Sequence, residues 1–166
     1  CIRDSMWLDH LNEFPESILF CMRGGLRSQI AQEWLKENGR DVPLIFGGYK
    51  KLRNYCMLTL DTIEQKKQKW IIIGGRTGSG KTKLIKKISS SIDLENIANH
   101  KGSAFGSNIT SQPSTINFEN RLAIEFLNKE SNEFLILEDE SRSIGKRTIP
   151  EKWYQKMKHS QVYMLD

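Results

Sequence analysis

Short apolar runs alternate with longer stretches of helical spacing along this chain. Four runs, at 18–21, 42–46, 70–74 and 134–137, are bounded by glycine or polar residues, as buried strands usually are. Between them, apolar residues recur every three or four positions, which is typical of helices that cover a sheet. The alternation predicts an α/β fold with layered helices and strands.

The predicted helices have recognisable ends. In the first, Ile30, Ala31, Trp34 and Leu35 share one face, and Gly39 closes the helix. A Lys- and Arg-rich helix follows Gly47-Gly48, and a proline near the first turn starts the last helix. The remaining predicted segments are a helix at 81–89, a loop-rich stretch at 99–114, a helix at 117–128 and a strand-like run at 162–165.

A polar run at 64–69 is the best candidate for a linker. We therefore predict two domains, at 1–66 and 67–166. The chain begins at Cys1 and ends directly after a strand-like run, so we expect an internal part of a longer protein.

Composition limits the class of protein. Hydrophobic residues make up 38% of the 166 positions and charged residues 27%, and no apolar run approaches the roughly 20 residues that cross a bilayer. The three cysteines form neither a metal-binding spacing nor an even disulfide set, which suggests a reducing cytoplasm. A formal charge of +5 is compatible with a nucleic-acid partner.

The first candidate site is a cysteine loop after the run at 18–21. Cys21 precedes a Gly24-Gly25 pair and a helix, and Arg23 and Arg27 lie close by in sequence. Loop N–H groups, the positive helix end and the arginine charges would all stabilise a thiolate. Such a thiolate can attack an electrophilic sulfur, selenium or phosphorus atom.

Other interpretations of this loop are a buried structural cysteine and a cysteine-dependent phosphatase. The Cys-x5-Arg-Ser spacing equals that of the phosphatases, whereas rhodanese loops are usually one residue shorter. Phe20 stands where tyrosine phosphatases usually have His, and no local acid is evident. We therefore favour a rhodanese-like loop, which makes 1–66 the C-terminal part of a rhodanese-like domain.

The second candidate site is a phosphate loop at 75–82 that fits G-x-x-x-x-G-K-[ST] completely, with a strand before it and a helix after it. Its backbone N–H groups would hold a di- or triphosphate, and its lysine would neutralise the distal phosphate. An N-K-x-D motif is absent, which disfavours a GTPase. The predicted phosphate-binding residues are Gly75, Thr77, Gly78, Ser79, Gly80, Lys81 and Thr82, in a P-loop NTPase-like parallel-sheet domain truncated at its C-terminus.

A Mg²⁺ site is expected beside this loop. The Thr82 hydroxyl can ligate the ion, and Glu138 or Asp139, at the end of a buried strand, could hold it through water. The alternative for the two carboxylates is a solvated strand end.

Taken with both loops, further stretches carry a family resemblance. They read CMRGGLRS at 21–28, GGYKKLR at 47–53, GGRTGSGKT at 74–82, DLENIANHKGSAFG at 93–106, QPS at 112–114 and LEDESRSIG at 137–145. In these stretches the chain resembles the tRNA 2-selenouridine synthases, a family with rhodanese and P-loop parts. The resemblance runs nearly end to end, although the family's upstream rhodanese half and its C-terminal region are not included.

The resemblance implies a reaction at the wobble uridine of thiolated tRNA. In this family 2-thiouridine becomes 2-selenouridine, with selenophosphate as donor, through an S-geranylated intermediate made from geranyl diphosphate. Cys21 matches the rhodanese cysteine, and 75–82 matches the phosphate loop. Our hypothesis assigns geranyl transfer to the P-loop and selenation to the cysteine loop.

Lys50, Lys51 and Arg53, beside Tyr49, are candidate tRNA contacts through phosphate binding and base stacking. Their alternative is a solvated helix face. Two other functions stay open: a P-loop kinase or ATPase with an accessory rhodanese module, and an inactive, truncated relative that binds anions or tRNA.

Overall fold

The computed structural model describes residues 2–76, 78–101 and 109–166, and the side chains from Met6 onward within these ranges. The chain divides into two compact units, Cys1–Tyr55 and Cys56–Asp166. Their boundary falls inside helix α3 (Gly48–Asp61), before the linker position that the sequence suggests. The assignment of domains at 1–66 and 67–166 stays a prediction, and each unit is described by itself.

The first unit contains α1 (Ile2–Glu13), α2 (Leu26–Glu37) and the start of α3. Its small core consists of Leu11, Leu35 and Val42. The predicted helix that Gly39 closes is confirmed: α2 ends at Glu37 with Asn38 as its C-cap, and Gly39 follows with a φ of 76°.

The strands predicted at 18–21 and 42–46 are wrong as continuous strands. The structure has a single parallel bridge there, between Leu19 and Leu44. The Leu19 N–H donates to the Pro43 carbonyl at 2.8 Å, and the Ile45 N–H donates to the Leu19 carbonyl at 3.0 Å. Pro43 has no N–H to extend the ladder, and no further strand lies beside the pair in the described part of this unit.

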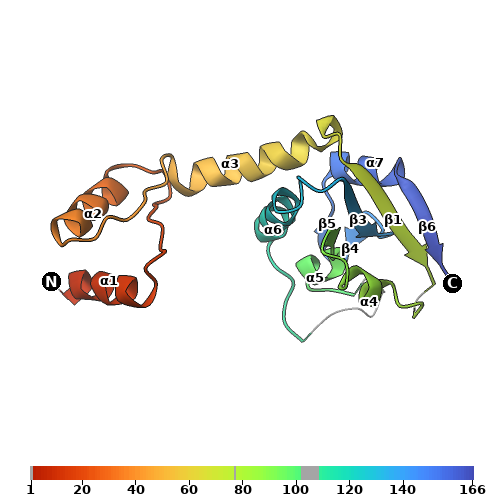
Figure 1. The fold of residues 1–166 in the computed structure, drawn as a ribbon, viewed down its shortest axis with the longest axis horizontal. Coiled ribbons are helices and arrows are strands. Elements are labelled where there is room, and N and C mark those ends of the chain that lie inside the picture. The colour runs from red at the N-terminus through yellow and green to blue at the C-terminus, as the bar shows by residue number, and fades with distance from the viewer. Residues whose placement is uncertain (1, 77, 102–108) are drawn as a thin grey trace. The chain divides into compact units, whose positions relative to one another are not determined.

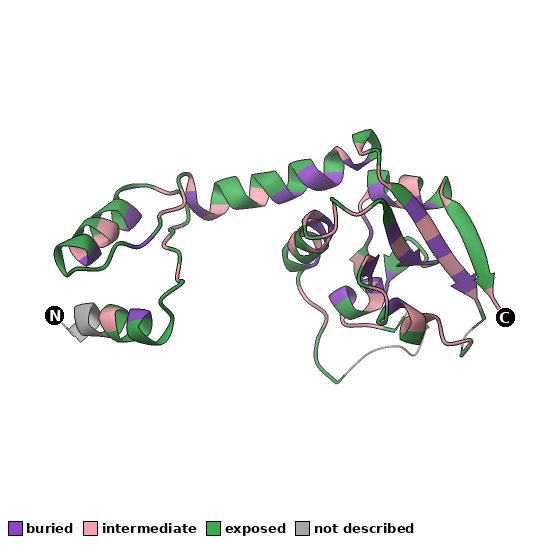
Figure 2. Ribbon diagram, in the orientation of Figure 1, coloured by how far each residue is buried: buried purple, intermediate pink, exposed green. Residues whose placement is uncertain are grey.

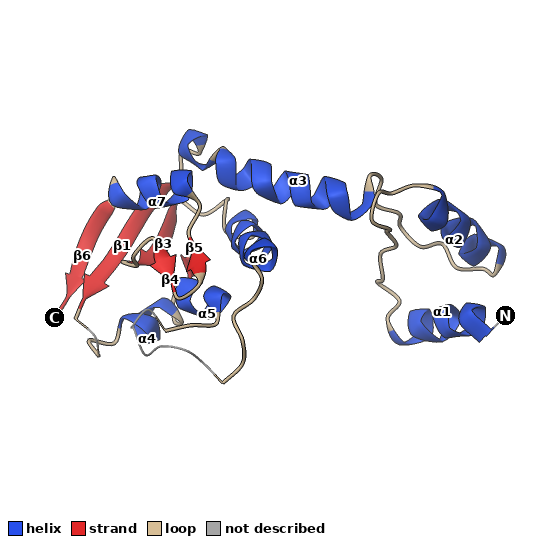
Figure 3. Ribbon diagram, turned by 180° about the vertical axis from the view of Figure 1, so that it is seen from behind, coloured by secondary structure: helices blue, strands red, loops and turns tan. Residues whose placement is uncertain are grey.

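The second unit is built on a parallel sheet whose strands lie in the order β2, β3, β1 and β6. Figure 1 shows β1 between β3 and β6. Seen from behind, β6 forms one edge and pairs only with β1 (Figure 3). The strand bounds are Lys69–Gly75 for β1, Ser91–Ile92 for β2, Phe134–Glu138 for β3 and Gln161–Leu165 for β6. A parallel sheet in the P-loop part of the chain, as predicted, is therefore confirmed.

Helices and a short hairpin cover this sheet. α4 packs against β1 and β3, α7 packs against β1, and α5 packs against α6. The core is aromatic where Trp153 of α7 meets Trp70 of β1 and Phe126 of α6, with ring centroids 4.7 and 5.6 Å apart. The bounds are Lys81–Ile85 for α4, Leu94–Ala98 for α5, Thr115–Leu127 for α6, Glu151–Lys158 for α7, Ile63–Gln65 for the 3₁₀ helix η1, Ser143–Ile144 for β4 and Arg147–Thr148 for β5.

Helix α4 is shorter than the predicted 81–89. After Ile85 the N–H groups of Lys87 and Ile88 bond three residues back rather than four. The Ser91 hydroxyl lies 2.5 Å from the Ile85 carbonyl and 2.7 Å from the Ile88 carbonyl, so it can satisfy a carbonyl that a longer helix would use internally. The chain thus enters β2 early.

Burial is uneven across the sheet. Along β1 from Trp70 onward the residues alternate between buried and half-buried, whereas four of the five residues of β6 are exposed (Figure 2). None of the helices described here is long and apolar enough to span a membrane.

Candidate functional site

The cysteine loop is held by hydrogen bonds to the start of α3. The Tyr49 N–H donates to the Cys21 carbonyl, and the Lys50 N–H donates to the Met22 carbonyl, both at 3.0 Å. These N–H groups belong to the first turn of a helix, where they lack partners within the helix. The carbonyls of Cys21 and Met22 thus accept from α3. The backbone N–H groups of Arg23, Gly24 and Gly25, which follow in the loop, act on the thiol instead.

Two glycines allow this contact. Gly24 and Gly48 have φ values of 63° and 57°, in the left-handed region. A Cβ on Gly48 would collide with the Cys21 carbonyl oxygen and the Gly24 nitrogen, and a Cβ on Gly24 would collide with the Gly47-Gly48 backbone. The backbone of the glycine pair at 47–48 therefore packs directly against the cysteine loop. The sequence pattern did not predict this role.

The thiol of Cys21 is acidified within this loop. Its pKa is lowered to about 6, first by the hydrogen bond from Ser28, whose hydroxyl lies 3.3 Å from the sulfur. The backbone N–H groups of Arg23, Gly25 and Gly24 lower the pKa further, while desolvation opposes them. Stabilisation of a thiolate by such donors produces a nucleophile at neutral pH.

Ser28 is the site residue that sequence reasoning missed. It is buried, and its hydroxyl lies 2.9 Å from the Gly25 carbonyl as well as 3.3 Å from the Cys21 sulfur. The single hydroxyl proton can serve either acceptor, so a thiolate would attract it. The serine of the Cys-x5-Arg-Ser spacing is the signal that could have identified it. Arg23 and Arg27 are exposed.

The predicted tRNA contacts lie in the first turns of α3, whose backbone is bonded to this loop. Lys50 and Lys51 are exposed on α3, and Arg53 is half-buried. The Lys50 backbone itself bonds to the loop at Met22. Two exposed lysine side chains thus start from the same turn of α3 that supports Cys21.

The phosphate loop follows β1. Lys81 folds back over it, with Nζ 2.6 Å from the Gly75 carbonyl and 3.1 Å from the Arg76 carbonyl. Gly80 precedes α4 with a φ of 92°, a conformation that favours glycine. Gly78 and Ser79 lie in the same turn, and Thr77 lies outside the described residues.

Strand pairing places an acid beside the loop. β1 and β3 are neighbours with Ile73 opposite Glu138, so the chain leaves both strands at the same edge of the sheet. The Thr82 hydroxyl donates to Glu138 Oε2 at 3.2 Å. Asp139 is exposed, and its backbone N–H donates to the Ile73 carbonyl at 2.9 Å. Of the two predicted carboxylates, Glu138 is the one in contact with the loop.

Several carboxylates crowd this edge. Burial, followed by the charges of Glu95 and Asp93, raises the pKa of Glu138 to about 7. Burial and the charges of Glu95 and Glu138 raise the pKa of Glu140 to about 7 as well. Glu140 is a second residue absent from the predicted set.

The oxygen atoms of Glu138 and Thr82 are suitable ligands for Mg²⁺. Glu138 Oε1 is buried without a hydrogen-bond partner, and the hydroxyl of Thr82 is adjacent. Among the described residues, no group of three or more His, Cys, Asp or Glu side chains is arranged to hold a metal ion. A Mg²⁺ ion at such a place takes one or two protein oxygens and completes its shell with phosphate and water.

A family model described as the tRNA 2-selenouridine synthase AAA domain matches residues 68–166. The chain belongs to the tRNA 2-selenouridine synthase family. No solved structure matches it.

Relatives from the tRNA 2-selenouridine synthase family cover almost the whole chain. Proteins named tRNA 2-selenouridine synthase from Shewanella frigidimarina and Sulfurovum sp. are 47% and 46% identical over 99% of the chain. One of the same name from Nitrosomonas europaea is 45% identical over 99% of the chain. The chain spans 45%, 45% and 44% of the lengths of these three relatives, respectively.

One of the stretches that resemble the tRNA 2-selenouridine synthases has a structural explanation. Gln112 Nε2 donates to the carbonyls of Ala98 and Ile144 at 3.0 and 2.9 Å, and its Oε1 accepts from the Lys146 N–H at 2.6 Å. One amide thus ties α5 to the β4–β5 hairpin. Ser114 caps the start of α6 by accepting from the Asn117 N–H.

Proposed function

We propose that this chain is part of an enzyme that converts 2-thiouridine to 2-selenouridine at the wobble position of tRNA. Membership of the tRNA 2-selenouridine synthase family is the observation that carries the proposal. The two loops support the proposal, because one provides a thiol of lowered pKa and the other a phosphate-binding loop beside a carboxylate. The two steps of the reaction need these two kinds of site.

In this proposal the phosphate loop binds the diphosphate of geranyl diphosphate. The sulfur of 2-thiouridine attacks the first carbon of the geranyl chain, and diphosphate leaves with the electron pair of the broken carbon–oxygen bond. Lys81, the loop N–H groups and Mg²⁺ near Thr82 and Glu138 would stabilise the departing charge. The Thr82–Glu138 contact supports this placement of the ion.

The cysteine loop would serve the selenium step, with selenophosphate as donor. Selenophosphate is an anion, and a loop whose N–H groups converge is suited to bind it. Cys21 would take part as the thiolate, which its lowered pKa makes the main form at neutral pH. Lys50, Lys51 and Arg53 would attract the tRNA backbone to the same loop.

The geranyl step is tested by Lys81→Ala in a protein of the relatives' full length that carries this chain. Thiolated tRNA and geranyl diphosphate are supplied, and the S-geranylated nucleoside is measured by mass spectrometry. We expect at least a hundredfold lower rate, and an unchanged rate with Lys83→Ala, which alters an exposed lysine of the same helix. Normal geranylation by Lys81→Ala would refute the assignment.

The selenium step is tested by Cys21→Ser on tRNA that already carries the geranylated nucleoside. We expect loss of selenium incorporation on this tRNA. In a separate assay with thiolated tRNA and geranyl diphosphate, the same variant should geranylate at the wild-type rate. Cys56→Ser is the matched control, because it makes the same change at a cysteine that is buried on α3 and belongs to neither loop. Full selenium incorporation by Cys21→Ser would exclude a role for this thiol.

Competition by ATP separates the proposal from a P-loop kinase or ATPase. Geranyl diphosphate should bind the wild-type protein more tightly than ATP does, and no phosphoryl transfer should be detected. Tight ATP binding accompanied by hydrolysis would favour the kinase or ATPase alternative.

A further inference from the structure

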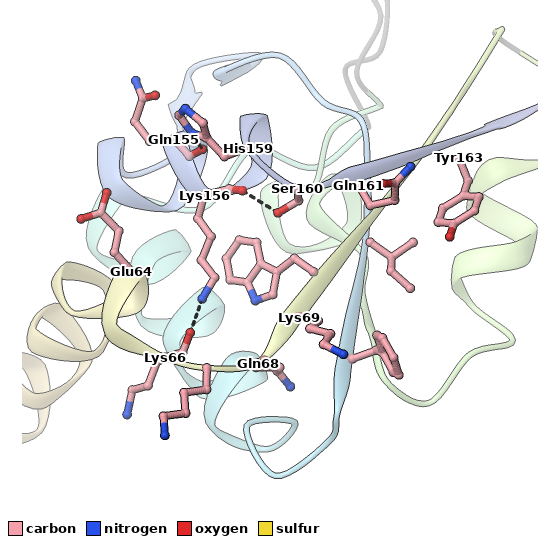
Figure 4. Close-up of a pocket in the computed structure, with 14 residues that line it drawn as sticks. Glu64, Lys66, Gln68, Lys69, Gln155, Lys156, His159, Ser160, Gln161 and Tyr163 are labelled. Atoms are coloured by element: carbon pink, nitrogen blue, oxygen red, sulfur yellow. Dashed lines mark hydrogen bonds between the residues drawn. The ribbon is translucent and has the colours of Figure 1, made fainter.

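The second unit has a hollow of about 740 Å³ that neither loop uses. It is lined by η1 and the linker after it, the first residues of β1, and the end of α7 with the start of β6 (Figure 4). The phosphate loop follows the last residue of β1, whereas the hollow lies at the first residues of that strand. The hollow is therefore a separate site, at the end of the sheet where β1 begins, and the phosphate loop lies at the end where β1 finishes.

Strand register creates this hollow. β1 begins at Lys69, but β6 begins at Gln161, which pairs with Ile71. Lys69 and Trp70 pair with β3 on one side, and no described strand lies beside them on the other. A strand edge without a neighbour leaves room and backbone groups for a ligand.

The charged residues of the lining are mainly lysines. It includes the four lysines Lys66, Lys67, Lys69 and Lys156, with Glu64 as its one acidic residue. Lys66 Nζ lies 2.6 Å from Glu130 and Lys69 Nζ lies 4.0 Å from Glu133. The Lys66–Glu130 pair is half-buried, whereas the Lys69–Glu133 pair is exposed. An exposed ion pair is worth little, so a phosphate oxygen can replace the carboxylate at Lys69.

Lys156 has a supporting role at the floor of the hollow. Its Nζ donates to the carbonyls of Ile63 and Lys66 at 2.9 and 2.7 Å and lies 5.0 Å from the centroid of the Trp70 ring. Figure 4 shows this side chain reaching from α7 to the Lys66 backbone. The bond fixes the path of the linker, so Lys66 and Lys67 emerge from an ordered segment.

Two buried polar atoms in the lining have no hydrogen-bond partner. They are Gln68 Oε1 and Trp70 Nε1, an acceptor and a donor. The Gln68 amide cannot turn freely, because its Nε2 donates to the carbonyls of Lys129 and Asn132. Trp70 itself is only 4% exposed. The two hydrogen bonds of its amide therefore hold Gln68 in a fixed orientation in the lining of the hollow.

Aromatic surface completes the site. Tyr163 is 56% exposed and Phe134 is 36% exposed, and both line the hollow. Lys69 Nζ lies 5.5 Å from the Phe134 ring centroid. Exposed aromatic rings among lysines are the combination that binds a nucleic-acid strand, since bases stack while ammonium groups hold phosphates.

We propose that this hollow binds the tRNA backbone, with a phosphate at Lys66, Lys67 and Lys69 and an unpaired base or ribose beside Tyr163. The inference rests on the proposed function, because it takes tRNA as the substrate. It adds a tRNA contact on the second unit that is distinct from the one proposed for Lys50, Lys51 and Arg53. A volume of about 740 Å³ exceeds the needs of a single phosphate ion and suits a nucleotide.

The test measures binding of an unmodified, fluorescently labelled tRNA transcript to the 166-residue chain by anisotropy at several salt concentrations. The variant Lys67→Gln/Lys69→Gln is compared with Lys36→Gln/Lys87→Gln, which removes the same charge at exposed lysines outside the hollow. We expect at least fivefold weaker binding for the hollow variant and a salt slope smaller by about 1–2. The control should change less than twofold.

Tyr163→Leu tests the stacking part. Loss of one base–aromatic contact should weaken binding about tenfold, with the salt slope unchanged because no charge is removed. Equal effects of the hollow and control lysine variants would show that only net charge matters and would overturn the proposal. Wild-type affinity in the hollow variant would overturn it as well.

The outcomes separate this inference from the proposed function. Binding of an unmodified transcript requires neither geranyl diphosphate nor selenophosphate. If the hollow variant loses tRNA binding while no selenouridine forms in the activity assay, the hollow stands and the proposed reaction fails. If selenouridine forms and the hollow variant binds normally, the hollow alone is refuted.

Discussion

At the scale of single residues, the reactivity of Cys21 depends more on its neighbours' hydrogen bonds than on nearby charge. Ser28 is the largest cause of the lowered pKa, and three backbone N–H groups follow. Arg23 and Arg27, which the sequence suggests as charge donors, are exposed. Water screens exposed charges strongly, whereas a hydrogen bond acts on the sulfur directly. The serine should therefore matter more than either arginine.

Alkylation by iodoacetamide measures this effect. The rate at Cys21 should rise with an apparent pKa of about 6 in the wild type. In Ser28→Ala the pKa should move upward, because the thiolate loses its hydroxyl donor. Peptide mass spectrometry follows each cysteine separately, with buried Cys56 as the slow internal reference. An unchanged pH profile in Ser28→Ala would contradict the assigned role.

Glu138 predicts a dependence of stability on pH. Its pKa in the folded chain is about 7 against an ordinary value of 4.5, so the folded state retains a proton that the unfolded state releases between these values. The free energy of unfolding therefore falls as pH rises through this interval, and the loss persists above pH 7. Below about pH 4.5 both states are protonated and the effect disappears.

The variant Glu138→Gln has no carboxyl group to ionise, so it should not lose stability as pH rises. In the absence of divalent ions, it should be more stable than the wild type by about 1–2 kcal/mol at pH 8, with the difference fading towards pH 4.5. Urea denaturation at both pH values measures the change, and exposed Glu133→Gln is the control. A variant less stable than the wild type at pH 8 would show that the carboxylate is stabilising there.

At the scale of elements, the cysteine loop and the start of α3 form one structure. Gly48→Ala places a methyl group against the Cys21 carbonyl at a φ of 57°, so we expect a loss of about 2 kcal/mol or more and a raised Cys21 pKa. Gly25→Ala is the matched change, because a Cβ there meets nothing within 4 Å and the φ is −100°.

Thermal unfolding measures the stability of both glycine variants, and the pH dependence of alkylation measures the pKa of Cys21 in each. Gly25→Ala should keep wild-type stability within about 0.5 kcal/mol, since surface changes away from special backbone usually do. If the two variants behaved alike, the contact between the loop and α3 would not be the constraint on the cysteine.

The elements that sequence predicts correctly are those with strong local signals. β1, β3 and α6 have long apolar or periodic runs, and Gly39 marks the end of α2. The sequence patterns did not predict α1, β2, α5 or the β4–β5 hairpin. β2 and each hairpin strand contain two residues, and α5 contains five, too few for a period to emerge. Their positions depend on contacts distant in sequence, such as those of Gln112.

The candidate sites show the same division. Motif spacing identifies Cys21, Lys81 and Thr82, because the chemistry requires those residue types at those intervals. The choice between Glu138 and Asp139 needs the strand register, which places Glu138 opposite Ile73 and next to Thr82. The hollow at the opposite end of β1 exists because β6 begins two residues later than β1 in the register. No motif in the sequence indicates that offset.

Gln112 gives a prediction for these long-range contacts. Gln112→Ala would leave the carbonyls of Ala98 and Ile144 and the Lys146 N–H without their present partner, so we expect a loss of about 1–3 kcal/mol. Gln155→Ala, on an exposed part of α7, should change stability by less than about 0.5 kcal/mol. Urea denaturation compares the two, and equal midpoints would mean that the Gln112 amide is not structural.

At the scale of the whole molecule, the two candidate loops belong to units with separate cores. Cys21 lies in the unit whose core is Leu11, Leu35 and Val42, and the phosphate loop lies in the unit built around Trp70, Phe126 and Trp153. The two clusters share no residue. Because burial of apolar surface is the dominant favourable term in folding, each unit should have a stability of its own.

Core truncations test that separation. Leu35→Ala should destabilise the first unit by about 2–5 kcal/mol and speed amide exchange in α2, while exchange in β1 and β3 stays at its wild-type rate. Phe126→Ala should do the reverse. Hydrogen exchange followed by mass spectrometry resolves these segments in one experiment. If Leu35→Ala accelerated exchange in β1 and β3 by the same factor as in α2, the chain would unfold as one cooperative body. Damage to the cysteine loop could then not be separated from damage to the phosphate loop.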